Sequence, residues 1–261
     1  MLRRAWRYRH FIVSSVTTEF RLRFVRSRFG AAWMVLNPLV QVAIYGIILS
    51  QLLSARLPGI DNPYAYALYL TAGMVAWSFF SEIVTRCLTV FIDNGHLMKK
   101  VAFPRIALPL IALGTAGVNN LLLIVAGLVV FALLGHLPGP TLVLLPALAV
   151  LTAAFALGVG LVLGILNVFV RDIGQAVPLV LQILFWFTPI VYVPDIVPAS
   201  VRALLPLNPL YPIVRAYQDV LVFGRLPSEF GLVVVAALAA GLLALALTLF
   251  RRAGPEMTDQ L

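Results

Sequence analysis

Long stretches without a charged residue dominate this chain of 261 residues and leave it few ways to fold. The uncharged runs are residues 29–55, 62–81, 106–170, 173–194 and 230–250. A helix needs about 20 apolar residues to cross the hydrocarbon layer of a membrane. The run 106–170 is long enough for two crossings, and residues 135–140 (GHLPGP) form a strong turn signal inside it. The runs therefore predict six membrane-spanning segments.

The composition excludes the soluble classes of protein. Hydrophobic residues make up 62% of the chain and charged residues only 11%, against roughly 25% charged residues in a soluble domain. The apolar runs are continuous rather than alternating, which predicts helices and not barrel strands. We therefore expect an all-α integral membrane protein. A single cysteine, Cys87, excludes an internal disulfide and any multi-cysteine metal site.

Basic residues predict which side of the membrane each loop faces. Six spans place both termini on one side, and that side holds most of the 19 lysines and arginines: Arg3, Arg4, Arg7, Arg9, Arg21, Arg23, Arg26, Arg28, Lys99, Lys100, Arg105, Arg171, Arg251 and Arg252. Because basic residues concentrate in cytoplasmic loops, we expect both termini in the cytoplasm. The net charge of +9 is then explained without nucleic-acid binding.

Residues 1–30 and 251–261 flank the predicted six-span membrane domain at 31–250. In the first segment Val13, Val16, Phe20 and Phe24 recur at helical spacing, which predicts an amphipathic helix on the cytoplasmic leaflet. The alternative is a basic leader that only sets the topology. The second segment is predicted as a short polar cytoplasmic tail.

Two loops are too apolar to be simple solvated connections. Residues 93–105 mix lysines with apolar side chains, which predicts a short cytoplasmic element presented to a partner; the alternative is a loop folded onto the membrane interface. Residues 195–229 are rich in proline and leucine. They predict two short helices, at 199–205 and 212–223, that dip back into the membrane. The alternative there is a cap that only packs on the spans.

No catalytic or metal-binding motif is present in the sequence. It has no nucleophile elbow, zinc-protease motif or phosphate-binding loop, so we predict no catalytic residue, metal or cofactor on this chain. If ATP drives the protein, ATP and Mg²⁺ bind a separate subunit. Glu82 and Arg86 are spaced to pair on one helix face in or near a span. The alternative is that Arg86 reaches the interface and Glu82 only neutralises it.

Aromatic side chains gather in the second and fifth predicted spans. Because such rings stack on sugars and lipid chains, we assign a substrate path to five of them: Trp77, Phe80, Phe185, Trp186 and Tyr192. The alternative is that they face lipid. Small residues also recur at helical spacing and predict close helix packing, namely Gly158, Gly160, Gly164, Ala236, Ala240 and Ala244.

Short motifs follow one another in a specific order along almost the whole chain. They are RSRFGAAWMVLNPL at 26–39, G-x3-W-x-FF at 73–80, Asn94 with KKVAFP at 99–104, N-x3-RDI at 167–173, P-x3-Q-x2-FW-x-TPI-x-Y at 178–192 and NP-x-Y-x3-R at 208–215. This ordered set resembles the permease subunits of type 2 ABC exporters. Within them it is most similar to the group that exports polysaccharides such as O-antigen and capsule, with teichoic acid exporters nearby.

The resemblance implies a multi-pass homodimer in the bacterial inner membrane, with two copies of a separate ATPase beneath it and a lipid-linked glycan as substrate. It implies ATPase coupling by Asn94, Leu97, Lys99, Lys100, Phe103, Pro104 and Arg105. It implies a periplasmic gate that contains Asn208, Pro209, Tyr211 and Arg215. The alternatives are a type 2 exporter of drugs, peptides or lipids and, remotely, an intramembrane transferase acting on polyprenyl lipids.

Overall fold

The computed structural model describes residues 8–24, 64–96 and 106–260, together with residues 32, 33, 36 and 40. Two predicted regions lie mostly or wholly outside the described residues: the first span at 29–55, and residues 97–105 of the cytoplasmic loop. Within the described ranges the regular structure is helical and contains no strand. The chain is therefore an all-helical protein in the part that can be described, as the sequence predicts.

Among the described residues, four helices are long and apolar enough to cross a membrane: α5 (Ala65–Asp93), α7 (Ala107–Leu133), α8 (Leu145–Phe169) and α12 (Glu229–Gln260). A 3₁₀ turn at Pro140–Leu144 precedes α8. A fifth apolar helix, α9 (Asp172–Phe187), has 16 residues. At 1.5 Å per residue it extends about 24 Å, less than the ~30 Å of a hydrocarbon core. The protein is thus a multi-pass membrane protein, and the count of six spans stays a prediction.

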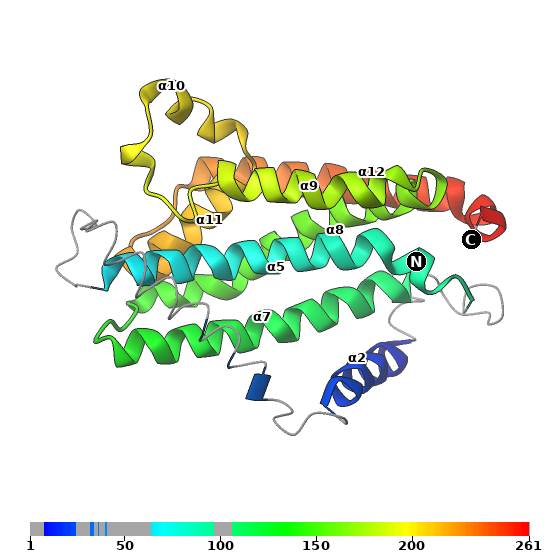
Figure 1. Cartoon of the computed structure of the whole chain (residues 1–261), viewed down its shortest axis with the longest axis horizontal. Coiled ribbons are helices and arrows are strands. Elements are labelled where there is room, and N and C mark those ends of the chain that lie inside the picture. Colours follow the sequence, from blue (N-terminus) through cyan, green and yellow to red (C-terminus); the bar gives the residue numbers. More distant parts are fainter. Residues whose placement is uncertain are drawn as a thin grey trace.

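The five helices run in alternating directions and lie side by side (Figure 1). One end of the bundle carries the end of α5, the start of α7 and the connection between α8 and α9. The other end carries the turn between α7 and α8 and the long segment between α9 and α12. At that turn Gly135 adopts a φ of 73°, a left-handed conformation that ends α7. The predicted break at 135–140 is confirmed.

Two helices differ in length from the uncharged runs of the sequence. The run 62–81 ends before Glu82, but α5 continues to Asp93 and contains both Glu82 and Arg86. The charges do not end the helix because Glu82 and Arg86 pair with each other. The run 173–194 suggested a longer fifth span, but α9 ends at Phe187. Thr188 precedes a proline and is extended, with a ψ of 132°, which stops the helix.

Helix α8 packs against both α5 and α12. Gly160 and Gly164 allow this close approach, because a Cβ at either position would collide with Cys87 of α5. The predicted packing role of the α8 glycines is confirmed. The matching prediction for Ala236, Ala240 and Ala244 was wrong within this chain, because all three are exposed. In an alanine-rich helix small residues occur on several faces, and α12 instead turns Val235, Ala239 and Ala246 inward.

The segment between α9 and α12 folds back onto the bundle. It contains the 3₁₀ turns Pro194–Ile196 and Leu205–Leu207, the short helix α10 (Ala199–Arg202), helix α11 (Leu210–Gln218) and a π-helical turn at Asp219–Phe223. The predicted helix at 199–205 is shorter than expected because Pro206 follows closely. Helix α11 and its π-helical turn together cover 210–223 and pack against α5. Gly224, with a φ of 62°, ends the turn.

Both flanking segments contain helix. Helix α2 (Arg9–Phe24) lies beside α7 and below it in Figure 1. Its half-buried side is formed by Ile12, Ser15, Val16, Glu19 and Phe20, whereas Val13 from the predicted apolar stripe is exposed. At the other terminus, residues 251–260 continue α12 as helix rather than forming a separate tail.

Candidate functional site

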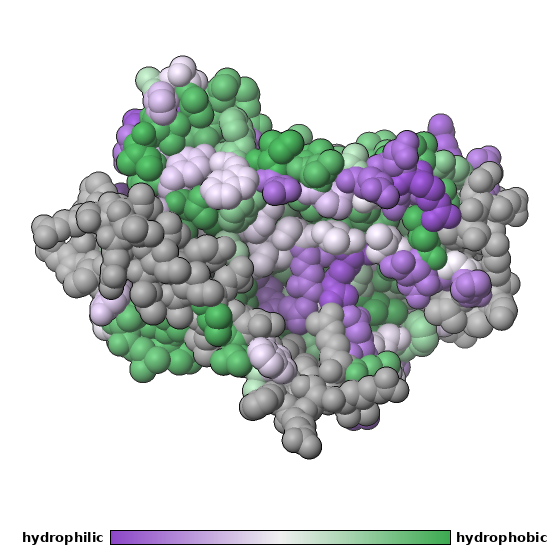
Figure 2. Space-filling view, viewed as in Figure 1, coloured by the Kyte–Doolittle hydropathy of each residue, from purple (hydrophilic) through white to green (hydrophobic). Residues whose placement is uncertain are grey.

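A polar cluster joins α2, α5 and α7. Arg86 lies between two carboxylates: its Nε is 2.8 Å from Glu82 Oε1, and its Nη1 is 2.9 Å from Glu19 Oε1. Thr115 donates a hydrogen bond of 2.8 Å to Glu19 Oε2, and Asn119 donates one of 2.5 Å to Glu82 Oε1. We call these five residues the inner junction. Figure 2 shows hydrophilic side chains over the middle of α5 and α7, and further hydrophilic side chains toward the right-hand end of the bundle.

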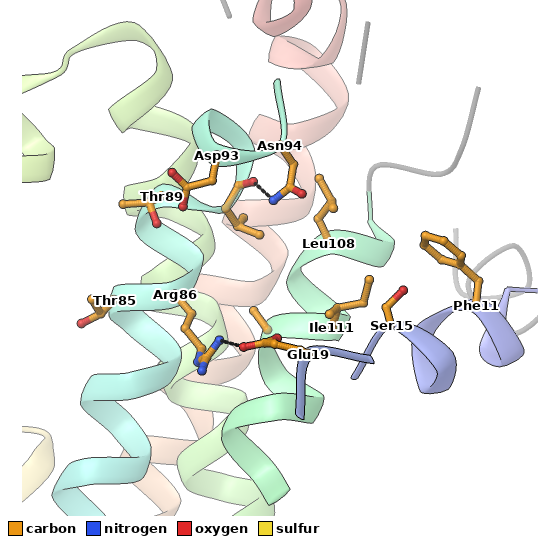
Figure 3. Close-up of a pocket in the computed structure, with 12 residues that line it drawn as sticks. Phe11, Ser15, Glu19, Thr85, Arg86, Thr89, Asp93, Asn94, Leu108 and Ile111 are labelled. Carbon is orange, nitrogen blue, oxygen red and sulfur yellow. Dashed lines mark hydrogen bonds and ion pairs between the residues drawn. The ribbon is translucent and has the colours of Figure 1, made fainter. Parts of the chain in front are cut away.

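A cavity of about 640 Å³ lies next to the inner junction. Figure 3 shows Glu19 on α2 facing Arg86 on α5, with Phe11 and Ser15 along α2 and Ile111 on α7. One part of the cavity lining is polar and the other part is apolar. The cavity extends along α5 as far as Asp93 and Asn94, where the predicted cytoplasmic coupling loop begins.

The predicted ATPase-coupling residues fall mostly outside the described part of the chain. Asn94 is described, and its side chain donates a hydrogen bond of 2.8 Å to the Val90 carbonyl of its own helix. Leu97, Lys99, Lys100, Phe103, Pro104 and Arg105 lie outside the described residues. Their role stays a prediction.

The predicted substrate-path aromatics form a series of ring contacts. Phe80 stacks on Phe155 with ring centroids 5.6 Å apart, and it lies 6.1 Å from Trp77. Trp77 meets Phe185 edge-on at 5.4 Å, and Phe185 meets Trp186 at 5.6 Å. The series runs from the core to the surface, since Phe80 is 3% exposed and Trp186 is 62% exposed. Phe80 and Trp77 are therefore packed in the core behind Phe185. Of the predicted residues in this series, only Trp186 is exposed.

Helix α9 exposes a stripe that contains both polar and apolar side chains. Val177 is its one residue buried within this chain. Gln175, Leu179, Gln182 and Trp186 are exposed and recur at helical spacing, so they share one face. Amide groups and an indole ring together can hydrogen-bond sugar hydroxyls and stack on sugar rings. The fifth predicted path residue, Tyr192, is half-buried beyond the end of α9.

A second polar network fastens the folded-back segment to the outer end of α5. Asn208, which is 4% exposed, donates to Thr188 Oγ1 at 2.8 Å and accepts from the Leu210 backbone N–H at 3.0 Å. Gln218 donates to the Pro189 carbonyl at 3.0 Å, and Tyr69 of α5 also donates to that oxygen, at 3.2 Å. We call these residues the outer clasp. The outer clasp thus joins the TPI motif to the NP motif, through the hydrogen bond from Asn208 to Thr188.

The other predicted gate residues lie around the outer clasp. Pro209 precedes α11, and Tyr211 is half-buried in its first turn. Arg215 pairs with Asp219 at 3.4 Å, and its guanidinium lies 5.4 Å from the centre of the Phe223 ring.

Sequence reasoning missed several members of these networks. The Glu82–Arg86 spacing was visible, but Glu19 lies 67 residues from Arg86 and no local pattern connects them. Asn119 and Thr115 were hidden because a polar residue inside an apolar run carries no sign of its partner. Gln218 belongs to the outer clasp although it was not among the predicted gate residues.

Comparisons with known proteins agree with the geometry. The family model described as "ABC-2 type transporter" matches residues 12–222. An O-antigen export system permease protein, RfbA, from Klebsiella pneumoniae is 29% identical over 220 residues, which cover 84% of this chain and 83% of the relative. A second RfbA from the same organism is 28% identical over 225 residues. RfbA from Myxococcus xanthus is 27% identical over 263 residues, and the match covers 100% of this chain and 99% of the relative.

The family match covers most of the described bundle, from α2 through the folded-back segment. It includes the inner junction, the outer clasp and the exposed stripe of α9. The chain therefore belongs to the ABC-2 type transporter family of membrane proteins.

Proposed function

We propose that this protein is the transmembrane subunit of an ATP-driven exporter that moves a lipid-linked polysaccharide across the bacterial inner membrane. The similarity of three O-antigen export permeases over most of the chain supports this cargo. The observation that carries it within the structure is the exposed α9 stripe, where Gln175, Gln182 and Trp186 present amide groups and an indole ring that suit sugar binding. The glycan is of the O-antigen, capsule or teichoic-acid type.

The exporter is proposed to contain two copies of this chain. Helix α9 is shorter than a hydrocarbon core and exposes two glutamines beside Pro178. Amide groups facing lipid are costly, so a second copy placed opposite this stripe, across a shared path, removes the amides from lipid. In this arrangement Trp186 and Gln182 of each copy face the glycan.

Energy is proposed to come from two copies of a separate cytoplasmic ATPase. The segment between α5 and α7, with Lys99 and Lys100, is the proposed contact. Both chain termini then lie in the cytoplasm. The ATPase drives transport only if it binds the two states of the permease with different affinity.

Replacing both lysines of the proposed contact tests the coupling. The Lys99→Glu, Lys100→Glu double variant is expected to insert normally and to lose most of the ATPase stimulation by the permease. The reason is that the two glutamates would repel an acidic surface of the ATPase to which the lysines bind. Arg251→Glu with Arg252→Glu is the matched control at the same membrane face. Unchanged ATPase stimulation and export in the lysine variant would contradict the coupling role.

Trimming Trp186 tests the cargo. Trp186→Ala is expected to slow the export of long glycans by several-fold, because one stacked aromatic ring contributes about 0.5–1.5 kcal/mol beyond its area. Export is measured by the chain-length profile of surface glycan on a gel, with Phe230→Ala, an exposed aromatic in α12, as the control. An unchanged profile would remove Trp186 from the path.

A type 2 exporter of drugs, peptides or lipids is the second candidate, because the family alone does not fix the cargo. Co-purification with the products of neighbouring genes discriminates the two. An ATPase encoded among glycosyltransferases favours the polysaccharide. Thiol labelling tests the topology: a cysteine at Asp195 should react from outside, whereas buried Cys87 should not react.

A further inference from the structure

Helix α2 is held to the bundle in a different way from the spans. Among residues 9–22, whose side chains are described, none is buried. The contact with α7 is half-exposed, and the cavity of about 640 Å³ opens between α2, α5 and α7. Apolar packing therefore contributes less to the docking of α2 than it does to the seams between α5, α8 and α12, and polar contacts matter more.

Glu19 is the residue through which α2 reaches both neighbouring helices. One carboxylate oxygen pairs with Arg86 of α5 at 2.9 Å, and the other accepts from Thr115 of α7 at 2.8 Å. The Glu19 and Arg86 side chains are 32% and 22% exposed, so water screens the pair only in part. The carboxylate thus bridges two spans from a third helix.

Arg86 keeps a partner when α2 moves away. Its Nε pairs at 2.8 Å with Glu82, four residues earlier on the same helix, and Glu82 is also held by Asn119. Removing one partner of a half-buried ion pair usually leaves a charge uncompensated. Here Arg86 remains paired inside α5 after Glu19 leaves. In addition, Glu19 and Glu82 are like charges on one guanidinium, and their repulsion weakens the docked state.

We propose that Glu19 is a positioning residue that docks α2 reversibly, with Glu82 as the competing carboxylate that permits release. Helix α5 continues from Arg86 to Asp93 and into the segment that ends where α7 begins. A docked α2 therefore moves with both ends of that segment, and a released α2 does not. This rests on the proposed function, in which that segment contacts the ATPase.

A disulfide between α2 and α7 can report the docked state. A Cβ at Gly114 would lie 3.0 Å from Val16 Cγ2, which places cysteines at these two positions within reach of a disulfide bond. The pair Val16→Cys and Gly114→Cys is made in a Cys87→Ala background, in the assembled complex with its ATPase in native membranes. The rate of oxidative cross-linking then measures how often α2 is docked.

The two carboxylates should act in opposite directions. Glu19→Gln is expected to slow cross-linking about threefold, in keeping with the strength of partly exposed ion pairs. Glu82→Gln is expected to speed it, because Glu19 then has Arg86 to itself. Arg21→Gln, an exposed charge on the same helix, is the control and should change nothing. The proposal is overturned if Glu19→Gln matches the control, or if Glu82→Gln slows cross-linking as Glu19→Gln does.

Export by the cross-linked complex separates this inference from the function on which it rests. The oxidised cysteine pair is expected to stop glycan export, and reductant is expected to restore it. Normal export while cross-linked overturns reversible docking as a step of transport and leaves the exporter assignment intact. Absence of export by the reduced complex overturns the proposed function. The cross-linking rates of the Glu19 and Glu82 variants still test whether α2 docks reversibly.

Discussion

The inner junction and the outer clasp both bind a segment to α5, one at each end of that helix, but they are built from different chemistry. The outer clasp uses neutral side chains that are buried and that mostly bond to backbone atoms, as Gln218 does with the Pro189 carbonyl. The inner junction uses charged side chains that are half-exposed and bond to one another. A buried amide that loses its partner has no substitute, whereas Arg86 has two carboxylates to choose from.

This difference indicates which of the two contacts opens more easily. Buried polar groups without partners cost about 1–3 kcal/mol each, so the outer clasp opens only at a high cost. Partly exposed ion pairs contribute about 0–1 kcal/mol, so the inner junction can exchange partners near room temperature. We therefore expect damage to the outer clasp to lower stability, and damage to the inner junction to change motion with little loss of stability.

The largest effect is expected from Asn208→Ala. The substitution leaves Thr188 Oγ1 without its donor and the Leu210 N–H without its acceptor. We expect a loss of about 2–6 kcal/mol, from two buried groups at about 1–3 kcal/mol each, seen as a lower Tm in detergent. Asn94→Ala is the control, since Asn94 bonds only within its own helix among the contacts described. Equal Tm values would show that the outer clasp is not a stability element.

A smaller effect is expected from Gln218→Ala. The Pro189 carbonyl loses one donor but keeps Tyr69, so about 1–2 kcal/mol of stability should be lost. Gln182→Ala, the same change at an exposed position of α9, is the matched control and should stay within about 0.5 kcal/mol. Thermal unfolding monitored by tryptophan fluorescence measures both. A Gln182 effect as large as that of Gln218 would remove the contrast between buried and exposed amides.

The smallest effect on stability is expected from Glu19→Gln. The pair with Arg86 is half-exposed and Glu82 takes over, so the free energy of unfolding should change by less than about 1 kcal/mol. The same variant should still slow the α2 to α7 cross-link. A fall in Tm comparable to that of Asn208→Ala would show that the inner junction is as fixed as the outer clasp.

Sequence reasoning predicted the four long apolar helices of the described residues because hydropathy along the chain depends on no distant partner. The end of α9 could have been predicted too, since Thr188 precedes a proline. The end of α5 is hidden from the hydropathy pattern, because the helix continues past the charges of Glu82 and Arg86. Asn119 of α7 supplies one partner of Glu82, from 37 residues away.

The residues of the candidate sites could be predicted where they cluster in the sequence. They could not be predicted where the fold brings together residues that are far apart in the sequence. The aromatic residues Trp77 and Phe185 were singled out by their clustering, and the fold brings their rings together. Glu19 was not, since it sits in a basic segment whose partners lie 67 and 96 residues away. Burial decided the rest: nothing in the sequence distinguishes the enclosed ring of Phe80 from the open one of Trp186.

The seam where Gly160 and Gly164 of α8 meet Cys87 of α5 has a mechanical consequence. With backbones in direct contact there, the two helices resist sliding and behave as one stiff rod. Tyr69 near the outer tip of that rod and Arg86 near its inner tip are then joined without slack. We therefore expect a tilt imposed at the inner junction to reach the folded-back segment at the other end of the bundle.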